Sequence, residues 1–247
     1  YGYAYNDYGI EQYATASGEG NAASVALDNG SGASLTISAN AVANASKGYA
    51  SATATIYEGI SQGAYASTGA ASVSLTNNGT MAITASAAAN GGTDAYADAS
   101  FEYGIYQDAS ASGEGNAASA TIDNSGTLTI AAKAVATAGT GSAEAYATAD
   151  DGLSQYATGN SGAASVALTN EGTLAITANA TANGGTRAYA DASLEDDIVN
   201  QGAYAYGTGN PASVSLNNSG TLTLAANAVA NAAAGEATAY ASAYSGI

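Results

Sequence analysis

The chain has 247 residues, with 20 Asp or Glu but only three Lys or Arg, and it contains neither His nor Cys. The absence of Cys excludes disulfides and thiolate metal sites, and the absence of His removes the commonest general base and the commonest metal ligand. A net charge of −17 would repel nucleic acid and anionic lipid, so we expect neither as a partner.

Large apolar side chains are scarce but regularly spaced. Ile, Leu, Val and Phe together make up 31 residues, a proportion that is typical of disordered chains. Alternation argues for order instead, because Ala, Val, Leu and Ile fall on every second position, as in Ala71 to Leu75. A period of two predicts β-strands, and no segment shows helical spacing or about 20 consecutive large apolar residues. We therefore expect an all-β chain without membrane insertion.

The first motif along the chain is Gly-Ile-x-Gln, which begins at Gly9 and recurs in later periods. It contains every Gln of the chain: Gln12, Gln62, Gln107, Gln155 and Gln201. A residue type confined to one phase of a repeat indicates stacking. We predict that these side chains form one structural column, inward or in a corner, rather than a ligand contact, and that Gly-Ile marks a corner of the coil.

After each Gln come an alternating Ala stretch, a Gly-rich turn and a short strand of the form Ala-Ser-Val-x-Leu. An Asn-x-Gly-Thr turn follows, in which Asn and Gly suit left-handed backbone angles. Its first Asn recurs as Asn29, Asn77, Asn124, Asn170 and Asn218. The last apolar position of the next, longer strand recurs at Ile37, Ile83, Ile130, Ile176 and Leu224, in steps of 46, 47, 46 and 48 residues. The chain is therefore a repeat protein with a period of about 47 residues.

The two halves of a period match each other, since Gly104 and Ile105 fall on Gly79 and Met81. This match predicts a unit of about 23 residues, so that residues 1–247 would form one right-handed parallel β-solenoid (β-helix) of about ten coils with an Ala-rich core. At about 4.8 Å per coil the rod would be about 48 Å long, and neighbouring Gln would lie about 9.6 Å apart, too far for direct amide bonds. A 47-residue coil in five layers is the alternative.

An acidic residue precedes each Gly-Ile corner or its degenerate copy: Asp7, Glu58, Glu102, Asp151 and Asp197. Oxygen ligands at stacked corners would suit calcium, and paired carboxylates are typical of glycosidases. The chain lacks the dense Asp-Gly repeats of calcium-binding solenoids and has few basic residues to assist catalysis. We therefore predict a solvated acidic edge, with no catalytic, metal or cofactor site. The alternative functions are polysaccharide binding or cleavage and calcium-dependent binding.

Five tyrosines share one phase of the strand that ends each period: Tyr49, Tyr96, Tyr146, Tyr189 and Tyr240. Most of their alternate neighbours are Ala, so the rings face outward if Ala faces the core. Stacked surface Tyr could bind sugars or another fibre, and aromatic ladders also stabilise a sheet.

Threonines such as Thr36, Thr84 and Thr129 invite comparison with ice-binding surfaces. Such a surface requires a flat and regular Thr-x-Thr array. The phase of these threonines shifts between copies, so the sequence does not favour ice binding.

The Gly-Ile-x-Gln, Ala-Ser-Val-x-Leu and Asn-x-Gly-Thr-Leu-x-Ile motifs, with alternating Ala, resemble the β-strand repeats of large secreted adhesins and autotransporter passengers of Gram-negative bacteria, especially sphingomonad-like ones. The resemblance covers the whole chain. It implies a non-enzymatic β-helical stalk or fibre outside the cell, on the bacterial surface. The partners that we expect are other copies of the chain, surface glycans or other cells.

Residues 3–10 and residues 240–247 lie at the same phase of the repeat. From Ile10 to Ile247 the chain spans about five periods. We therefore expect the segment to belong to a longer or polymerising fibre.

Overall fold

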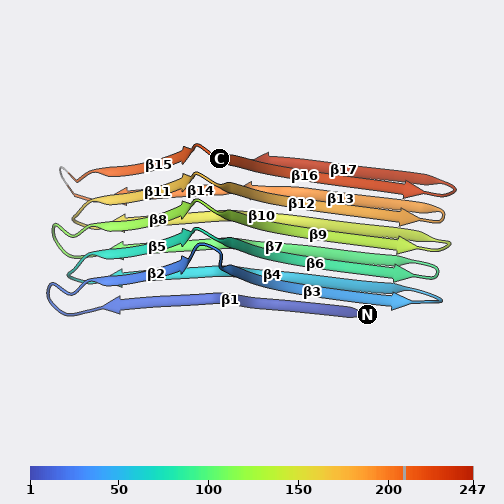
Figure 1. Cartoon of the computed structure of the whole chain (residues 1–247), viewed down its shortest axis with the longest axis horizontal. Helices are drawn as coiled ribbons and strands as arrows, with labels where there is room; N and C mark the ends of the chain where they lie inside the picture. The colour runs from blue at the N-terminus through green and yellow to red at the C-terminus, as the bar shows by residue number, and fades with distance from the viewer. Residues whose placement is uncertain (208–209, 247) are drawn as a thin grey trace.

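The computed structural model describes residues 1–207 and 210–246, and within them every regular element is a β-strand. Ile247 is the last residue of the segment 240–247 that matches residues 3–10, and it lies outside the described residues. The strands form three parallel sheets, named A, B and C here, that are stacked coil upon coil (Figure 1). The expected all-β parallel solenoid is therefore confirmed.

Sheet A contains the long strands and forms one wall of the molecule. Its members are β1 (Gly2–Ala16), β4 (Ala50–Ala66), β7 (Ala95–Ala111), β10 (Ser142–Gly159), β13 (Arg187–Asp197), β14 (Val199–Ala205) and β17 (Glu236–Ser245). The facing wall is divided between two sheets of shorter strands. Sheet B contains β2 (Ala23–Asn29), β5 (Ala71–Asn77), β8 (Ala118–Asn124), β11 (Ala164–Asn170) and β15 (Ala212–Asn218). Sheet C contains β3 (Ser34–Ala45), β6 (Thr80–Gly91), β9 (Thr127–Ala138), β12 (Thr173–Gly184) and β16 (Thr221–Ala232).

One coil follows a long strand of sheet A, turns back, and returns through one strand of sheet B and one strand of sheet C (Figure 1). The next long strand then pairs in parallel with the first, so that Gln12 is level with Gln62 and Gln62 with Gln107. Each coil therefore uses a whole period of about 47 residues, and the chain forms five coils, with β17 lying on β13 as part of a sixth layer.

The prediction of ten coils of about 23 residues is wrong. The two matching halves of a period are the two facing walls of one coil, and they resemble each other because both must alternate inward apolar and outward polar residues. Six stacked layers are about 24 Å high, whereas the 17 residues of β4 extend about 56 Å. The longest dimension therefore runs along the strands and not along the stack (Figure 1).

The core consists of a larger and a smaller cluster side by side. The larger cluster fills the space between sheet C and the first halves of the long strands, and it holds the Ile and Leu side chains together with many Ala. The smaller cluster lies between sheet B and the second halves, and it is made of Ala with Val73 and Val166. Because Ala is short, the walls can approach closely, and each coil buries little apolar surface of its own.

The Gly-Ile pair lies in the middle of the long strand, so its predicted place at a corner is wrong. Burial alternates along β7 except here, where Glu102 and Tyr103 are both half-exposed and Gly104 and Ile105 are both buried. A Cβ atom on Gly104 would lie 2.5 Å from the carbonyl oxygen of Gly152 and 2.7 Å from Cγ2 of Ile130 on the facing wall. Glycine is needed because the neighbouring strand and the side chain of Ile130 on the facing wall leave no room for a Cβ atom at this point.

The fifth coil breaks this pattern, because Ile198 stands level with Gly152 of the preceding coil. The Ile198 side chain is fully buried, and the strand is interrupted between β13 and β14. One extra residue is accommodated, and Asp196 takes a φ of 49°. A side chain in place of the glycine thus accompanies an outward bulge, which carries Glu195, Asp196 and Asp197.

We expect Gly104→Ala to lower the free energy of unfolding by about 1–3 kcal/mol, because the new methyl group would overlap the Gly152 carbonyl and Ile130. Urea unfolding measures the loss. Gly30→Ala is the control, since no atom lies within 4 Å of the place that its Cβ would occupy. Equal stability of the two variants would contradict the close approach of the walls.

Candidate functional site

The five predicted glutamines form one continuous column of side-chain amides on sheet A. From Gln62 onward, Nε2 of each Gln donates to Oε1 of the Gln in the preceding coil, at 2.9 Å from Gln62 to Gln12 and at 2.9 Å from Gln107 to Gln62. The next two bonds, from Gln155 and Gln201, measure 2.9 and 2.8 Å. The predicted spacing of about 9.6 Å is wrong, because the strands that carry successive Gln pair directly with each other, with no other strand between them.

The four glutamine amides from Gln62 onward also bond across the core. Nε2 of Gln62 donates to the carbonyl oxygen of Ser74 in sheet B at 3.2 Å, and the same bond recurs in later coils. Gln62 stands between Ile60 of the larger core cluster and Ala64 of the smaller one. The column therefore divides the two clusters and ties the facing walls together.

The five predicted turn asparagines form a second column, where sheet B turns into sheet C. Here Nδ2 donates to Oδ1 of the Asn in the following coil, at 2.7, 2.7, 2.7 and 2.6 Å along Asn29, Asn77, Asn124, Asn170 and Asn218. The first four also donate to a backbone carbonyl of the following coil, as from Asn77 to Thr127 at 3.0 Å. These four side chains are buried, so both columns are structural.

The outward face of sheet A carries four of the five predicted tyrosines, and Tyr49 lies just before β4. Tyr96, Tyr146, Tyr189 and Tyr240 form one row, with successive ring centroids 5.6, 5.5 and 5.7 Å apart. Tyr49 is about half-exposed, and its ring contacts Tyr1 at 6.1 Å.

A second row was not predicted and lies on the same face. It passes through Tyr8, Tyr57, Tyr103, Tyr106 and Tyr156, with centroid distances of 5.6 to 6.5 Å. The sequence does contain a signal for this row, because a Tyr stands one or two places before several Gly-Ile pairs. The acidic residue next to each of these tyrosines was interpreted instead.

Carboxylates alternate with these tyrosines from coil to coil. Tyr96 is level with Glu144, and Asp98 with Tyr146, so that an acid usually faces a ring rather than another acid. The Tyr189 hydroxyl donates to Asp191 at 3.1 Å and the Tyr65 hydroxyl to Asp108 at 3.1 Å. Fourteen of the 20 acidic residues lie in strands of sheet A.

Burial perturbs several of these groups. It raises the pKa of Asp108, although the bond from Tyr65 acts in the opposite direction. Burial, followed by the charge and hydrogen bond of Asp98, raises the pKa of Tyr96 to about 12. The largest effect on an acid falls on Asp150, where burial and then the charges of Glu195 and Asp196 raise the pKa to about 6.

An open groove follows the tyrosine row toward the bulge of the fifth coil. It has a volume of about 470 Å³, and its walls include Tyr146, Tyr189, Tyr240, Asp191 and Glu195. It adjoins a second hollow of about 710 Å³ that is lined by Asp151, Glu195, Asp196, Asp197, Asn200 and Tyr244. Of the five acids predicted at corners, Asp151 and Asp197 meet in this hollow, and the others lie elsewhere along sheet A.

No group of three Asp or Glu side chains in residues 1–207 and 210–246 is arranged to hold a metal ion. Nor does this part of the chain contain a helix that could cross a membrane. Comparison with protein-family models, curated proteins and solved structures finds no match to this chain. Functional conclusions therefore rest on the geometry. Aromatic faces beside hydrogen-bonded carboxylates can stack on sugar rings or hold cations.

We expect Gln107→Leu to cost about 1–3 kcal/mol of unfolding free energy, because Oε1 of Gln62 and Nε2 of Gln155 each lose a buried partner. Gln201→Leu should cost less, since this Gln ends the column and is only half-buried. Urea denaturation of both variants tests the column. A Gln107 variant that is as stable as the parent would show that the column contributes nothing.

Asp150→Asn should stabilise the protein at neutral pH. The folded carboxyl has a pKa of about 6 against an ordinary 3.8, so its contribution to stability is complete below about pH 4 and is lost as the pH rises through 6. The variant should gain on the order of 1 kcal/mol at pH 7, after allowance for solvent screening. Melting curves at pH 4 and pH 7 measure it.

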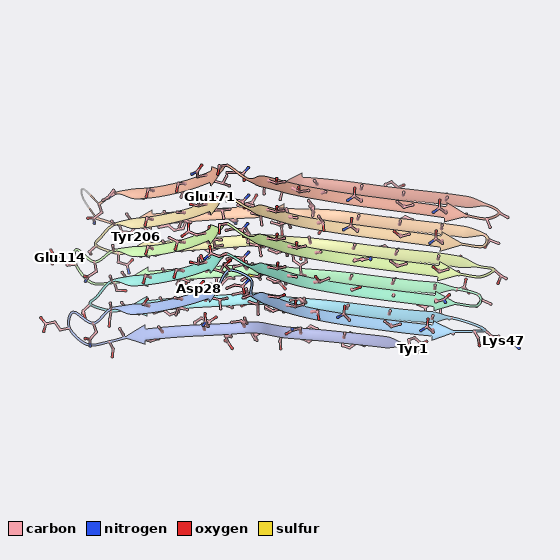
Figure 2. The ribbon with its side chains drawn as sticks, viewed as in Figure 1. Tyr1, Asp28, Lys47, Glu114, Glu171 and Tyr206 are labelled. Atoms are coloured by element: carbon pink, nitrogen blue, oxygen red, sulfur yellow. The ribbon has the colours of Figure 1, made fainter. Side chains whose placement is uncertain are left out.

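Asp28→Asn is the matched control for Asp150→Asn. Asp28 is an exposed acid near the turn from sheet B to sheet C, away from the acidic bulge (Figure 2). An equal gain at pH 7 from both substitutions would mean that only the overall net charge matters.

Proposed function

We propose that this chain is a non-catalytic structural repeat of an extracellular fibre on a bacterial surface. The observation that carries the proposal is the unbroken register of the two amide columns through all five coils. Each coil offers the next the same donors and acceptors, so a further coil would be bound in the same way. That coil can come from the same chain or from another copy.

The two faces at the ends of the stack support this proposal. β2 and β3 at one end, and β15 and β16 at the other, pair with a neighbour on one side only. The inward side chain of Val214 in β15 is 50% exposed, whereas its counterpart Val166 one coil earlier is 1% exposed. Unpaired strand edges with open apolar positions favour the addition of another strand.

The proposal of a non-catalytic role rests on the chemistry of the chain. It has no His or Cys and three basic residues. The acids of sheet A alternate with tyrosines, and several of these acids accept a hydrogen bond from a tyrosine hydroxyl. This arrangement favours a structural role for the acids over a catalytic one. The location outside the cell rests on the resemblance to secreted bacterial repeats.

Glycan binding on sheet A is a second candidate, favoured by the groove beside Tyr146, Tyr189 and Tyr240. Aromatic rings stack on sugars, and carboxylates accept hydrogen bonds from hydroxyl groups. Binding of neutral and charged glycans to the folded chain separates a purely structural role from an adhesive one.

Concentration-dependent growth of the folded chain into rods tests the fibre. We expect a diffraction spacing of about 4.8 Å along the rod axis. Val214→Asp should block growth, because it places a charge on the open end of the core. Val229→Asp is the control, since Val229 has similar exposure in the same coil but points outward from sheet C. A chain that stays monomeric at every concentration would contradict assembly from separate copies.

A further inference from the structure

The outward face of sheet C is broad and regular. Its five strands have 12 residues each and pair without a register shift. The strands run side by side with little twist (Figure 1). The strands of sheet A, in contrast, lose the alternation of inward and outward residues at the Gly-Ile positions, and the sheet is broken in the fifth coil.

Threonine hydroxyls stand in register on this face. One column consists of Ser34, Thr80, Thr127, Thr173 and Thr221, one residue from each coil. In the next column Thr36, Thr129 and Thr223 alternate with Ala82 and Ala175, and in the third Thr84 and Thr177 alternate with Ser38, Ala131 and Ala225. The threonine positions that shift between copies in the sequence therefore alternate strictly from one coil to the next. With one coil for each period of about 47 residues, they form a regular two-dimensional array on the surface.

The same face is almost free of charge, although the protein carries a net charge of −17. The strands of sheet C contain no acid and no aromatic residue, and Lys133 is their one charged residue. The tyrosines and most acids are gathered on the opposite wall. Sheet C therefore has no aromatic ring on which a sugar could stack and no carboxylate that could bind a cation.

The hydroxyl groups of the first threonine column are free to bind something outside the protein. Thr80, Thr127, Thr173 and Thr221 accept bonds at their backbone carbonyls from the asparagine column. None of their hydroxyls has a partner within the part of the chain that the structure describes. The first column thus presents unpaired hydroxyls and methyl groups at fixed spacings, whereas in the third column the hydroxyls of Ser38 and Thr177 accept hydrogen bonds from Asn40 and Asn179.

The dimensions suit a rigid and periodic partner. Five strands at about 4.8 Å and 12 residues at about 3.3 Å give a face of roughly 19 by 40 Å, or about 760 Å². This is comparable to the roughly 800 Å² that each partner buries in a stable protein interface. The strand spacing also lies close to one lattice repeat of hexagonal ice.

We propose that the outward face of sheet C binds ice. Ice is uncharged, and its surface is a periodic array of hydrogen-bond donors and acceptors, which threonine hydroxyls can match in either sense. The methyl groups of Thr and Ala leave water free to order, whereas a charged side chain imposes its own hydration shell. This binding does not depend on whether the chain also forms fibres.

Inhibition of ice recrystallisation by the folded chain, with thermal hysteresis as a second readout, tests the proposal. Lys133→Asn removes the one charge on the face and matches Asn179 in the next coil, so it should lower the inhibitory concentration several-fold. Lys47→Asn makes the same change of charge at the turn beyond sheet C and should change nothing (Figure 2).

Thr127→Lys should abolish most of the inhibition by placing a charge in the threonine column. Thr53→Lys, at an outward position of sheet A, is its control and should retain full activity. Circular dichroism and melting curves show that the variants are folded. A parent chain without effect on ice, or equal activity in all four variants, would overturn the proposal. Binding to an uncharged crystalline polysaccharide, lost in Thr127→Lys but without any effect on ice, would also overturn it.

Discussion

Hydrogen bonding between buried side-chain amides in successive coils is the interaction on which the rest of this structure depends. The core is mostly Ala at alternate positions, so a slip of two residues between neighbouring strands would replace one Ala by another at little cost. The glutamine and asparagine columns remove that freedom. A slip would leave buried amides unpaired, at about 1–3 kcal/mol for each one. The columns therefore select one register where packing alone does not.

The two columns donate in opposite directions along the stack. Gln62 donates toward the N-terminal coil, whereas Asn29 donates toward the C-terminal coil. Their side-chain dipoles therefore oppose each other across the core. The register that they fix also aligns the outer surfaces, so that tyrosines meet in rows on sheet A and threonines stand in columns on sheet C. Both surfaces are consequences of one buried pattern. As a result, most acidic residues lie on the wall formed by sheet A, and sheet C carries none.

The sequence was sufficient to predict strands, the period and the inward column of glutamines, because alternation and repetition are local properties. It did not reveal the size of the coil. The match between Gly104 and Gly79 reflects two walls that face each other, and similar inward patterns cannot distinguish facing strands from stacked ones. The direct contact of Gln62 with Gln107 and the lattice of threonines both follow from the size of the coil, so both were missed. The bulge at Ile198 was also missed, because its cause is the distance to the facing wall.

Nuclear Overhauser contacts between the side-chain amides of Gln62 and Gln107 test the central claim most directly. These residues are 45 positions apart in the sequence, and their amide groups lie 2.9 Å apart in the structure. A five-coil solenoid predicts strong cross-peaks between the two amides, and again between Gln107 and Gln155. The absence of any contact between glutamine amides would contradict both the column and the 47-residue coil.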